Sequence, residues 1–258
     1  NIKIVCSDRS HYYGIISNLI DENKYTIYNV TALSDQDLQS IFNSVPESIR
    51  RDRLIKEVDS NKYDKDTLFE FVSRNVNQRN VKDRYSTALR ELEREDPDLA
   101  EFLVLCAYMH SCHVPLPFEV AYDYFDDFNA DDIFSMKEDA ADIIKDYIPK
   151  DDSYANMDYY FPRSRYIADV IVEACSCKLL SKVLNGVLDK VPYPHICDYK
   201  IFHKYAFDKN IVLKAFVNWR DGKAFYEKAF IYDNRNPYVL QQGALYLSQK
   251  RRYDDAFV

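Results

Sequence analysis

Glycine is scarce in this sequence, which has 4 glycines and 9 prolines among 258 residues. So little glycine disfavours turn-rich β folds and phosphate-binding loops, because both depend on its backbone freedom. The phosphate-loop pattern G-x-x-x-x-G-K-[ST] is absent from the chain. No run approaches the 18 apolar residues of a membrane-spanning helix, and no signal-peptide pattern is present. These absences favour a cytoplasmic protein built from long helices.

Aromatic residues are abundant, with 22 tyrosines and 15 phenylalanines, and 47% of the residues are hydrophobic. The chain can therefore bury a substantial core. Its net charge of −8 argues against a nucleic-acid-binding domain as a whole. Most of its cysteines sit inside apolar helical patterns, which predicts reduced core residues: Cys6, Cys106, Cys112, Cys175, Cys177 and Cys197.

The N-terminal part reads as a small α/β unit. Two runs rich in β-branched residues, 2–7 and 25–30, predict strands. Ser34 and Asp37 have the spacing of a capping box, and the helix after them carries Leu38 and Phe42 on one face. Residues 46–64 are charged and irregular, which is typical of a loop.

Apolar periodicity predicts mostly helices from residue 66 onward. The helix that begins at Pro97 is expected to bury one face, with Phe102 and Cys106 on it. Residues 151–161 are typical of a turn between two short strands, a β-wing. The helices are expected over 66–77, 81–95, from Pro97 to the prolines at 115 and 117, 118–125, 131–147 and 163–175.

From residue 179 onward the pattern is helical, with a break at the prolines 192 and 194. Residues 219–257 predict two antiparallel helices and the start of a third. Ala229 is small enough to let a neighbouring helix approach, and Pro237 opens the next helix. Leu240, Ala244 and Leu247 are expected to form its apolar stripe. This stretch resembles a tetratricopeptide repeat, a helix pair of about 34 residues that binds partners.

The order of these features resembles the C-terminal part of a STAND-type P-loop ATPase. The resemblance covers nearly the whole chain and is carried by Asp8-Arg9, 31–38, Phe69-Glu-Phe71, the motif from Tyr160 to Val170 and the C-terminal repeat. It implies a mainly α protein with a small α/β remnant of the ATPase core. The implied domains are the end of the nucleotide-binding core (1–45), a helical lid (46–85), a winged-helix-like module (86–177) and tetratricopeptide-like repeats (178–258).

The same resemblance implies a nucleotide contact for Arg9, Arg163 and Arg165. Arg9 would face the terminal phosphate of the nucleotide, a role that suits the forked guanidinium group. A solvated arginine after an edge strand is the open alternative for Arg9. Ser164 stands where such proteins often have a histidine. The phosphate loop would lie upstream of Asn1, so ATP or ADP with Mg²⁺ is expected in the parent protein and no cofactor in this segment alone.

Two constellations imitate metal sites. His110, Cys112 and His113 lie close together, but Cys175-x-Cys177 is a poor match to zinc spacing, and His110 is expected to pack in the core. Residues 127–138 have the spacing of a calcium loop, with Asp132 where that loop needs glycine. Acidic residues also favour a helix start without any metal.

These features predict a regulatory and sensing segment of a STAND-like signalling or defence ATPase, with no catalysis by this segment alone. The repeats would bind a protein partner, and the activated parent protein could form a homo-oligomer. The alternative is a helical protein–protein interaction scaffold without a nucleotide. A winged-helix DNA-binding protein is disfavoured by the acidic balance, and no membrane partner is expected.

Overall fold

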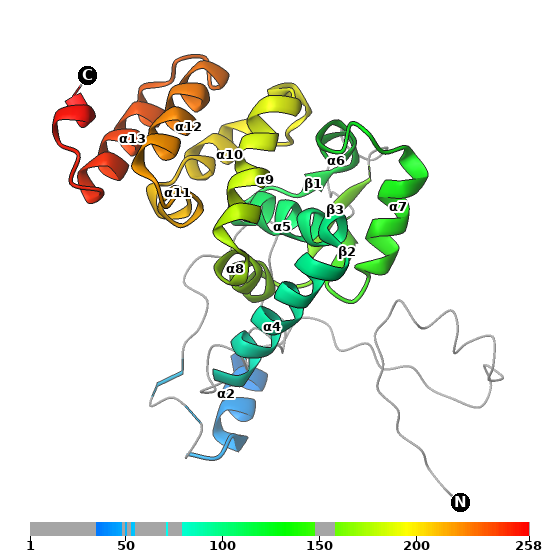
Figure 1. Cartoon of the computed structure of the whole chain (residues 1–258). Helices are drawn as coiled ribbons and strands as arrows, with labels where there is room; N and C mark the ends of the chain where they lie inside the picture. Colours follow the sequence, from blue (N-terminus) through cyan, green and yellow to red (C-terminus); the bar gives the residue numbers. More distant parts are fainter. Residues whose placement is uncertain are drawn as a thin grey trace, which may run out of the picture.

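The computed structural model describes residues 35–47, 50, 53–54, 71, 79–147 and 158–257 (Figure 1). These residues form eleven α-helices and one small antiparallel sheet, which confirms a mainly α protein. The strands expected at 2–7 and 25–30 lie outside the described residues, as do Ser34 and nearly all of the helix expected at 66–77. None of the helices in the described ranges is long and apolar enough to cross a bilayer.

The first described helix, α2 (Asp35–Ser44), confirms the helix predicted after the expected capping box. Leu38 and Phe42 are buried together with Phe71, and Ile41 and Leu54 pack against them. These residues form a small cluster that is separate from the main core.

The main core is built around α5 (Pro97–Ser111). Asp96 accepts a hydrogen bond from the Leu99 N–H group at 3.0 Å, and Pro97 occupies the first turn, so the predicted start is confirmed. The expectation of one buried face is wrong, because every residue from Ala100 to His110 is buried. Helices α4 (Arg79–Glu95) and α8 (Arg165–Ala174) pack against α5 together with the sheet and α9 (Cys177–Lys190).

The sheet has the order β1–β3–β2, with β1 at Leu116–Pro117, β2 at Ile144–Tyr147 and β3 at Tyr159–Pro162. Both neighbours of β3 run antiparallel to it, and Tyr160 lies opposite Leu116 on one side and Asp146 on the other. Helices α6 (Phe118–Tyr124) and α7 (Ala130–Asp139) lie between β1 and β2 in the chain.

The single helix predicted over 131–147 is wrong. Helix α7 ends at Asp139, and the chain turns and enters β2 at Ile144. Ile143 and Ile144 continue the helical spacing of Ile133, which accounts for the error. These β-branched residues instead lead into a strand that pairs with the aromatic β3. The predicted wing is therefore displaced: its second strand matches β3, and its first strand begins seven residues earlier than expected.

Beyond α9 the chain is helical, and Figure 1 shows α10–α13 continuing away from the sheet towards the C-terminus. The predicted break at the prolines is confirmed by a 3₁₀ turn at Tyr193–His195. The helices that follow are α10 (Tyr199–Ala206), α11 (Lys209–Ala215), α12 (Trp219–Tyr232) and α13 (Pro237–Gln249). The expected start of a further helix is a 3₁₀ turn at Asp254–Phe257.

Helices α12 and α13 form the predicted antiparallel pair. Ala229 is fully buried, as expected, and Pro237 lies in the first turn of α13. The predicted stripe of α13 is wrong at Leu240, which is 51% exposed, because Val239 and Tyr246 face the core instead. Gly222 permits the close approach: a Cβ atom there would lie 2.2 Å from the Tyr246 ring.

Candidate functional site

The three arginines singled out by the sequence are not brought together within the described residues, because Arg9 lies outside them. Arg163 follows β3, and its Nε and Nη2 atoms donate to the Ala141 carbonyl at 3.0 and 2.8 Å. Its guanidinium therefore holds the turn between α7 and β2. Arg165 begins α8, and the Ser164 hydroxyl between the two arginines caps that helix by accepting from the Ile167 N–H group. A nucleotide contact for these arginines stays a prediction.

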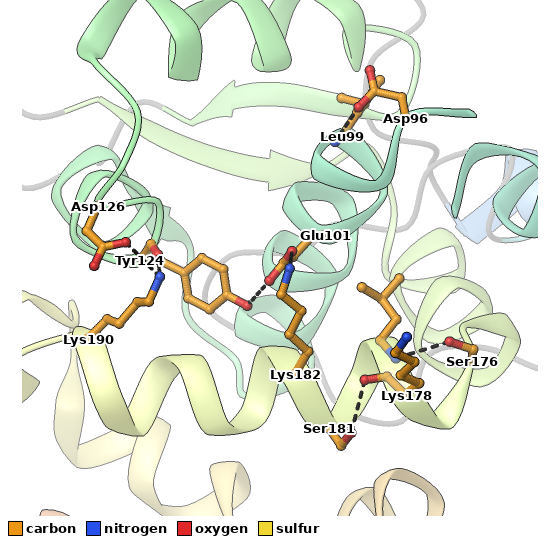
Figure 2. A network of polar contacts seen from close by, with 11 residues as sticks. Asp96, Leu99, Glu101, Tyr124, Asp126, Ser176, Lys178, Ser181, Lys182 and Lys190 are labelled. Carbon is orange, nitrogen blue, oxygen red and sulfur yellow. Dashed lines mark hydrogen bonds and ion pairs between the residues drawn. The ribbon is translucent and has the colours of Figure 1, made fainter. Parts of the chain in front are cut away.

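The most buried charged side chain in the described part of the chain belongs to Glu101 of α5. Its side chain is 4% exposed, and it accepts the Tyr124 hydroxyl at 2.5 Å and the Lys182 ammonium group at 2.5 Å (Figure 2). Burial, followed by the bond to this carboxylate, raises the pKa of Tyr124 well above its usual range. Tyr124 comes from α6 and Lys182 from α9, so one carboxylate joins three helices.

Two further pairs join α6 and the turn after it to the end of α9 and the turn that follows α9. Lys190 donates to the Tyr124 carbonyl at 3.1 Å and to Asp126 at 2.7 Å (Figure 2). That hydrogen bond lowers the pKa of Asp126. His195 lies 2.5 Å from Asp123, measured from Nδ1 to Oδ2. We call the three pairs Glu101–Lys182, Asp126–Lys190 and Asp123–His195 the ionic seam.

In the ionic seam, the acidic partners lie on α5, on α6 or just after α6. The basic partners lie on α9 or in the turn after it. Lys182 is 64% exposed, whereas the Glu101 carboxylate is almost completely buried. A buried carboxylate that loses its partners is costly, while an exposed ion pair contributes little. The stability of this contact therefore depends mainly on the buried bond between Glu101 and Tyr124.

An open groove of about 670 Å³ lies between α9 and the α11–α12 corner. Its lining includes the buried Phe216 and Phe225 together with amide, hydroxyl, carboxylate and lysine side chains. Such a mixture of apolar and hydrogen-bonding groups suits a peptide better than a compact ligand. The polar lining residues are Lys178, Ser181, Asn185, Asn218, Asp221 and Lys228.

A second buried carboxylate fixes the turn between α12 and α13. Asp233 is 6% exposed and accepts from the Tyr199 hydroxyl at 2.6 Å and from the Asn236 amide at 2.8 Å. His203 of α10 lies 3.8 Å from the same carboxylate. Asn234 and Arg235 have positive φ angles of 51° and 61°. These bonds attach α10 to a strained turn and point to a structural role.

The motifs that imitate metal sites have structural roles in the fold. His110 is buried, as predicted, with its ring 4.2 Å from that of Phe161. Asn129 and Asp132 form a reciprocal capping box at the start of α7, which accounts for part of the calcium-like spacing. No group of three potential metal-ligating side chains occurs among the described residues.

The prediction of core cysteines is confirmed for three of the five cysteines in the described ranges, and Cys6 lies outside those ranges. Cys106, Cys112 and Cys175 are buried, whereas Cys177 is exposed and Cys197 is partly exposed. Burial raises the pKa of the Cys106 and Cys112 thiols far above the usual range and that of Cys175 to about 11. These three thiols are therefore poor nucleophiles.

Comparison with known proteins finds no match for this chain among family models, curated proteins or solved structures. Sequence reasoning missed Glu101 and Lys182. The sequence does contain one signal for this site, a glutamate inside the most apolar helix. Such a glutamate indicates a buried partner, because an unpaired charge is rarely buried.

Proposed function

We propose that this chain is a regulatory segment of a STAND-like ATPase, in which a winged-helix-like module transmits partner binding by the repeats to the nucleotide state. The order α5–β1–α6–α7–β2–β3, with a three-stranded antiparallel sheet, supports the winged-helix-like assignment. The α12–α13 pair, closed by Gly222 against Tyr246, supports the tetratricopeptide-like assignment. The setting expected for such a protein is cytoplasmic signalling or defence.

One observation carries the coupling role: a single hydrophobic core runs from Leu89 in α4 to Leu247 in α13. The sheet module and the repeat helices share this core and are also joined by the ionic seam. Movement of α9 relative to α5 would have to break the bonds at Glu101, so the two regions have a discrete contact that a partner could favour or oppose.

Within this proposal, a protein partner binds the groove between α9 and the α11–α12 corner. The groove is lined by Lys178 and Ser181 from α9, the same helix that carries Lys182 and Lys190 of the seam. A peptide in the groove would therefore contact α9, the helix whose lysines form ion pairs with Glu101 and Asp126. The nucleotide, ATP or ADP with Mg²⁺, would bind the ATPase core of the parent protein, of which residues 1–45 are the expected end.

The first test is the reading frame upstream of Asn1, where the proposal requires a G-x-x-x-x-G-K-[ST] pattern. If the pattern is present, ADP release from the full-length protein should accelerate in Glu101→Gln, which keeps the shape of the side chain but removes its charge. Glu91→Gln, at an exposed position of α4, serves as the matched control. The absence of the pattern, or equal release rates in both variants, would contradict the proposal.

A second test concerns this chain alone, which lacks the phosphate cradle and its lysine. Isothermal titration with ATP and Mg²⁺ should show no micromolar binding. A saturating isotherm would contradict the view that the nucleotide site lies outside these residues.

The alternative, an interaction scaffold without a nucleotide partner, uses the same groove and is favoured if no phosphate-loop pattern lies upstream of Asn1. A DNA-binding role is disfavoured by α7, the helix in the recognition position of the module. Its one lysine, Lys137, is paired with Glu138 and Asp146. The remaining charges of α7 are the carboxylates of Asp131, Asp132 and Asp139, which would repel a duplex.

A further inference from the structure

Three aromatic rings form a continuous stack on the surface of α6 and α7. The Phe118 ring lies 5.9 Å from that of Tyr122 and 5.1 Å from that of Phe134, with interplanar angles of 22° and 16°. Phe118 packs against the core, whereas Tyr122 is 47% and Phe134 41% exposed. We call these three residues the aromatic stack. Figure 1 shows α6 and α7 at the end of the molecule away from α13.

The segment that carries the stack has charged side chains of one sign. Residues 114–136 contain six carboxylates and no lysine or arginine. Glu119 precedes Tyr122 by three residues in α6, and Asp131 precedes Phe134 by three in α7, so each acidic residue neighbours an exposed ring on its helix. Lys137, three residues after Phe134, is paired with Glu138 and Asp146 and is therefore neutralised.

Not all of these carboxylates have an internal partner. Asp123 and Asp126 belong to the ionic seam, and Asp132 caps α7. Asp127 and Asp131 are exposed and form no ion pair with any of the described residues. The aromatic stack therefore lies beside negative charge that the fold does not use.

We propose that the aromatic stack is a docking surface for a cationic, arginine-bearing segment of a protein partner. A guanidinium group stacks on aromatic faces and can bind a carboxylate at the same time. The exposed rings of Tyr122 and Phe134, each stacked on Phe118, with Asp131 one turn before Phe134, offer both kinds of contact. The same charge disfavours nucleic acids and anionic membranes, and this proposal does not depend on a nucleotide role for the chain.

The probe is a phage-displayed library of random dodecapeptides selected on the full 258-residue chain. We expect the recovered peptides to be enriched in arginine. A fluorescein-labelled recovered peptide should lose at least tenfold in affinity when its arginines are replaced by citrulline, which keeps the shape and removes the charge. Recovery of apolar peptides without arginine or lysine, or of no consensus, would overturn the proposal.

Variants of the chain locate the binding site. Tyr122→Ser with Phe134→Ser should abolish binding, and Asp127→Asn with Asp131→Asn should weaken it at least fivefold. Tyr253→Ser and Glu91→Gln remove a ring that is 58% exposed and an exposed carboxylate elsewhere and should leave the affinity unchanged. Phe134→Trp provides a gain of function, because indole is the strongest cation–π acceptor. Equal affinity in the serine double variant and the Tyr253→Ser control would refute the assignment of this surface.

Discussion

Gly186→Ala is the substitution that tests the packing beneath the ionic seam most directly. Gly186 lies in α9, and a Cβ atom there would be 2.5 Å from the Cε2 atom and 2.9 Å from the hydroxyl oxygen of Tyr124. The Tyr124 side chain is 3% exposed and its hydroxyl is bonded to Glu101, so the ring has little freedom to move. The added methyl group must therefore displace either the ring or the helix.

Two costs and one gain set the expected magnitude. Overpacking a core contact costs about 1–3 kcal/mol. Displacing the hydroxyl from the buried carboxylate removes a charge-assisted hydrogen bond, which contributes about 1.5–3 kcal/mol. Replacing glycine by alanine inside a helix contributes about 0.8–1 kcal/mol of stability in the opposite direction. We expect the variant to be destabilised by about 2–4 kcal/mol.

Urea unfolding followed by circular dichroism at 222 nm measures this difference. Tyr124→Leu provides the decisive background, because it removes the ring that the new methyl group would strike. In that background Gly186→Ala should stabilise the protein by about 0.8–1 kcal/mol, the helix-propensity gain alone. If Gly186→Ala alone, with Tyr124 retained, is as stable as the wild type, the close packing of α9 on α6 is refuted.

Three further substitutions and one change of pH are informative. Ala229→Trp should lower the free energy of unfolding by about 1–3 kcal/mol, because Ala229 is 0% exposed between helices; an unchanged melting temperature would contradict this burial. Tyr160→Phe should leave the free energy of unfolding unchanged or raise it by up to about 1 kcal/mol, since the buried Tyr160 hydroxyl has no hydrogen-bond partner among the described residues. Tyr108→Phe should lower the free energy of unfolding by about 1 kcal/mol, because it removes the hydrogen bond to the Ala206 carbonyl. Alkaline pH should destabilise the fold: burial raises the pKa of Tyr246 to about 12 and that of Tyr124 further, so the folded state retains protons that the unfolded chain loses above about pH 10. The buried thiols of Cys106, Cys112 and Cys175 likewise retain protons that the unfolded chain loses above about pH 8.5. Urea midpoints measured from about pH 7 to 11 should therefore begin to fall near about pH 8.5 and fall more steeply above about pH 10, and a midpoint that stays constant would contradict these raised pKa values.

Local signals were sufficient to predict most helix positions. Asp96 followed by Pro97 marks the start of α5, and Asn236 followed by Pro237 marks that of α13, because caps and first-turn prolines act within a few residues. The error at β2 has a non-local cause. Ile143 and Ile144 fit a helix by spacing, and only pairing with β3, about fifteen residues later, makes the strand favourable.

The candidate site was less predictable for the same reason. Glu101, Tyr124 and Lys182 are far apart in the sequence, and the bond between Lys182 and Glu101 joins residues 81 positions apart. No short motif encodes such a contact. The phase error in α13 shows a related limit, since Leu240 is as apolar as its buried neighbours and only the position of α12 decides which face is covered.

The burial of α5 on all sides from Ala100 to His110 also determines how the protein can open. Its eleven buried residues contact helices that follow it by up to about a hundred positions, as the bond from Tyr108 to Ala206 illustrates. Backbone amides of α5 can therefore exchange with solvent only when the sheet module and the first repeat helices separate together. The rate of hydrogen exchange at the α5 amides therefore measures the free energy needed to separate the sheet module from the first repeat helices. Cutting the chain between α8 and α9 would leave one side of this helix exposed to water.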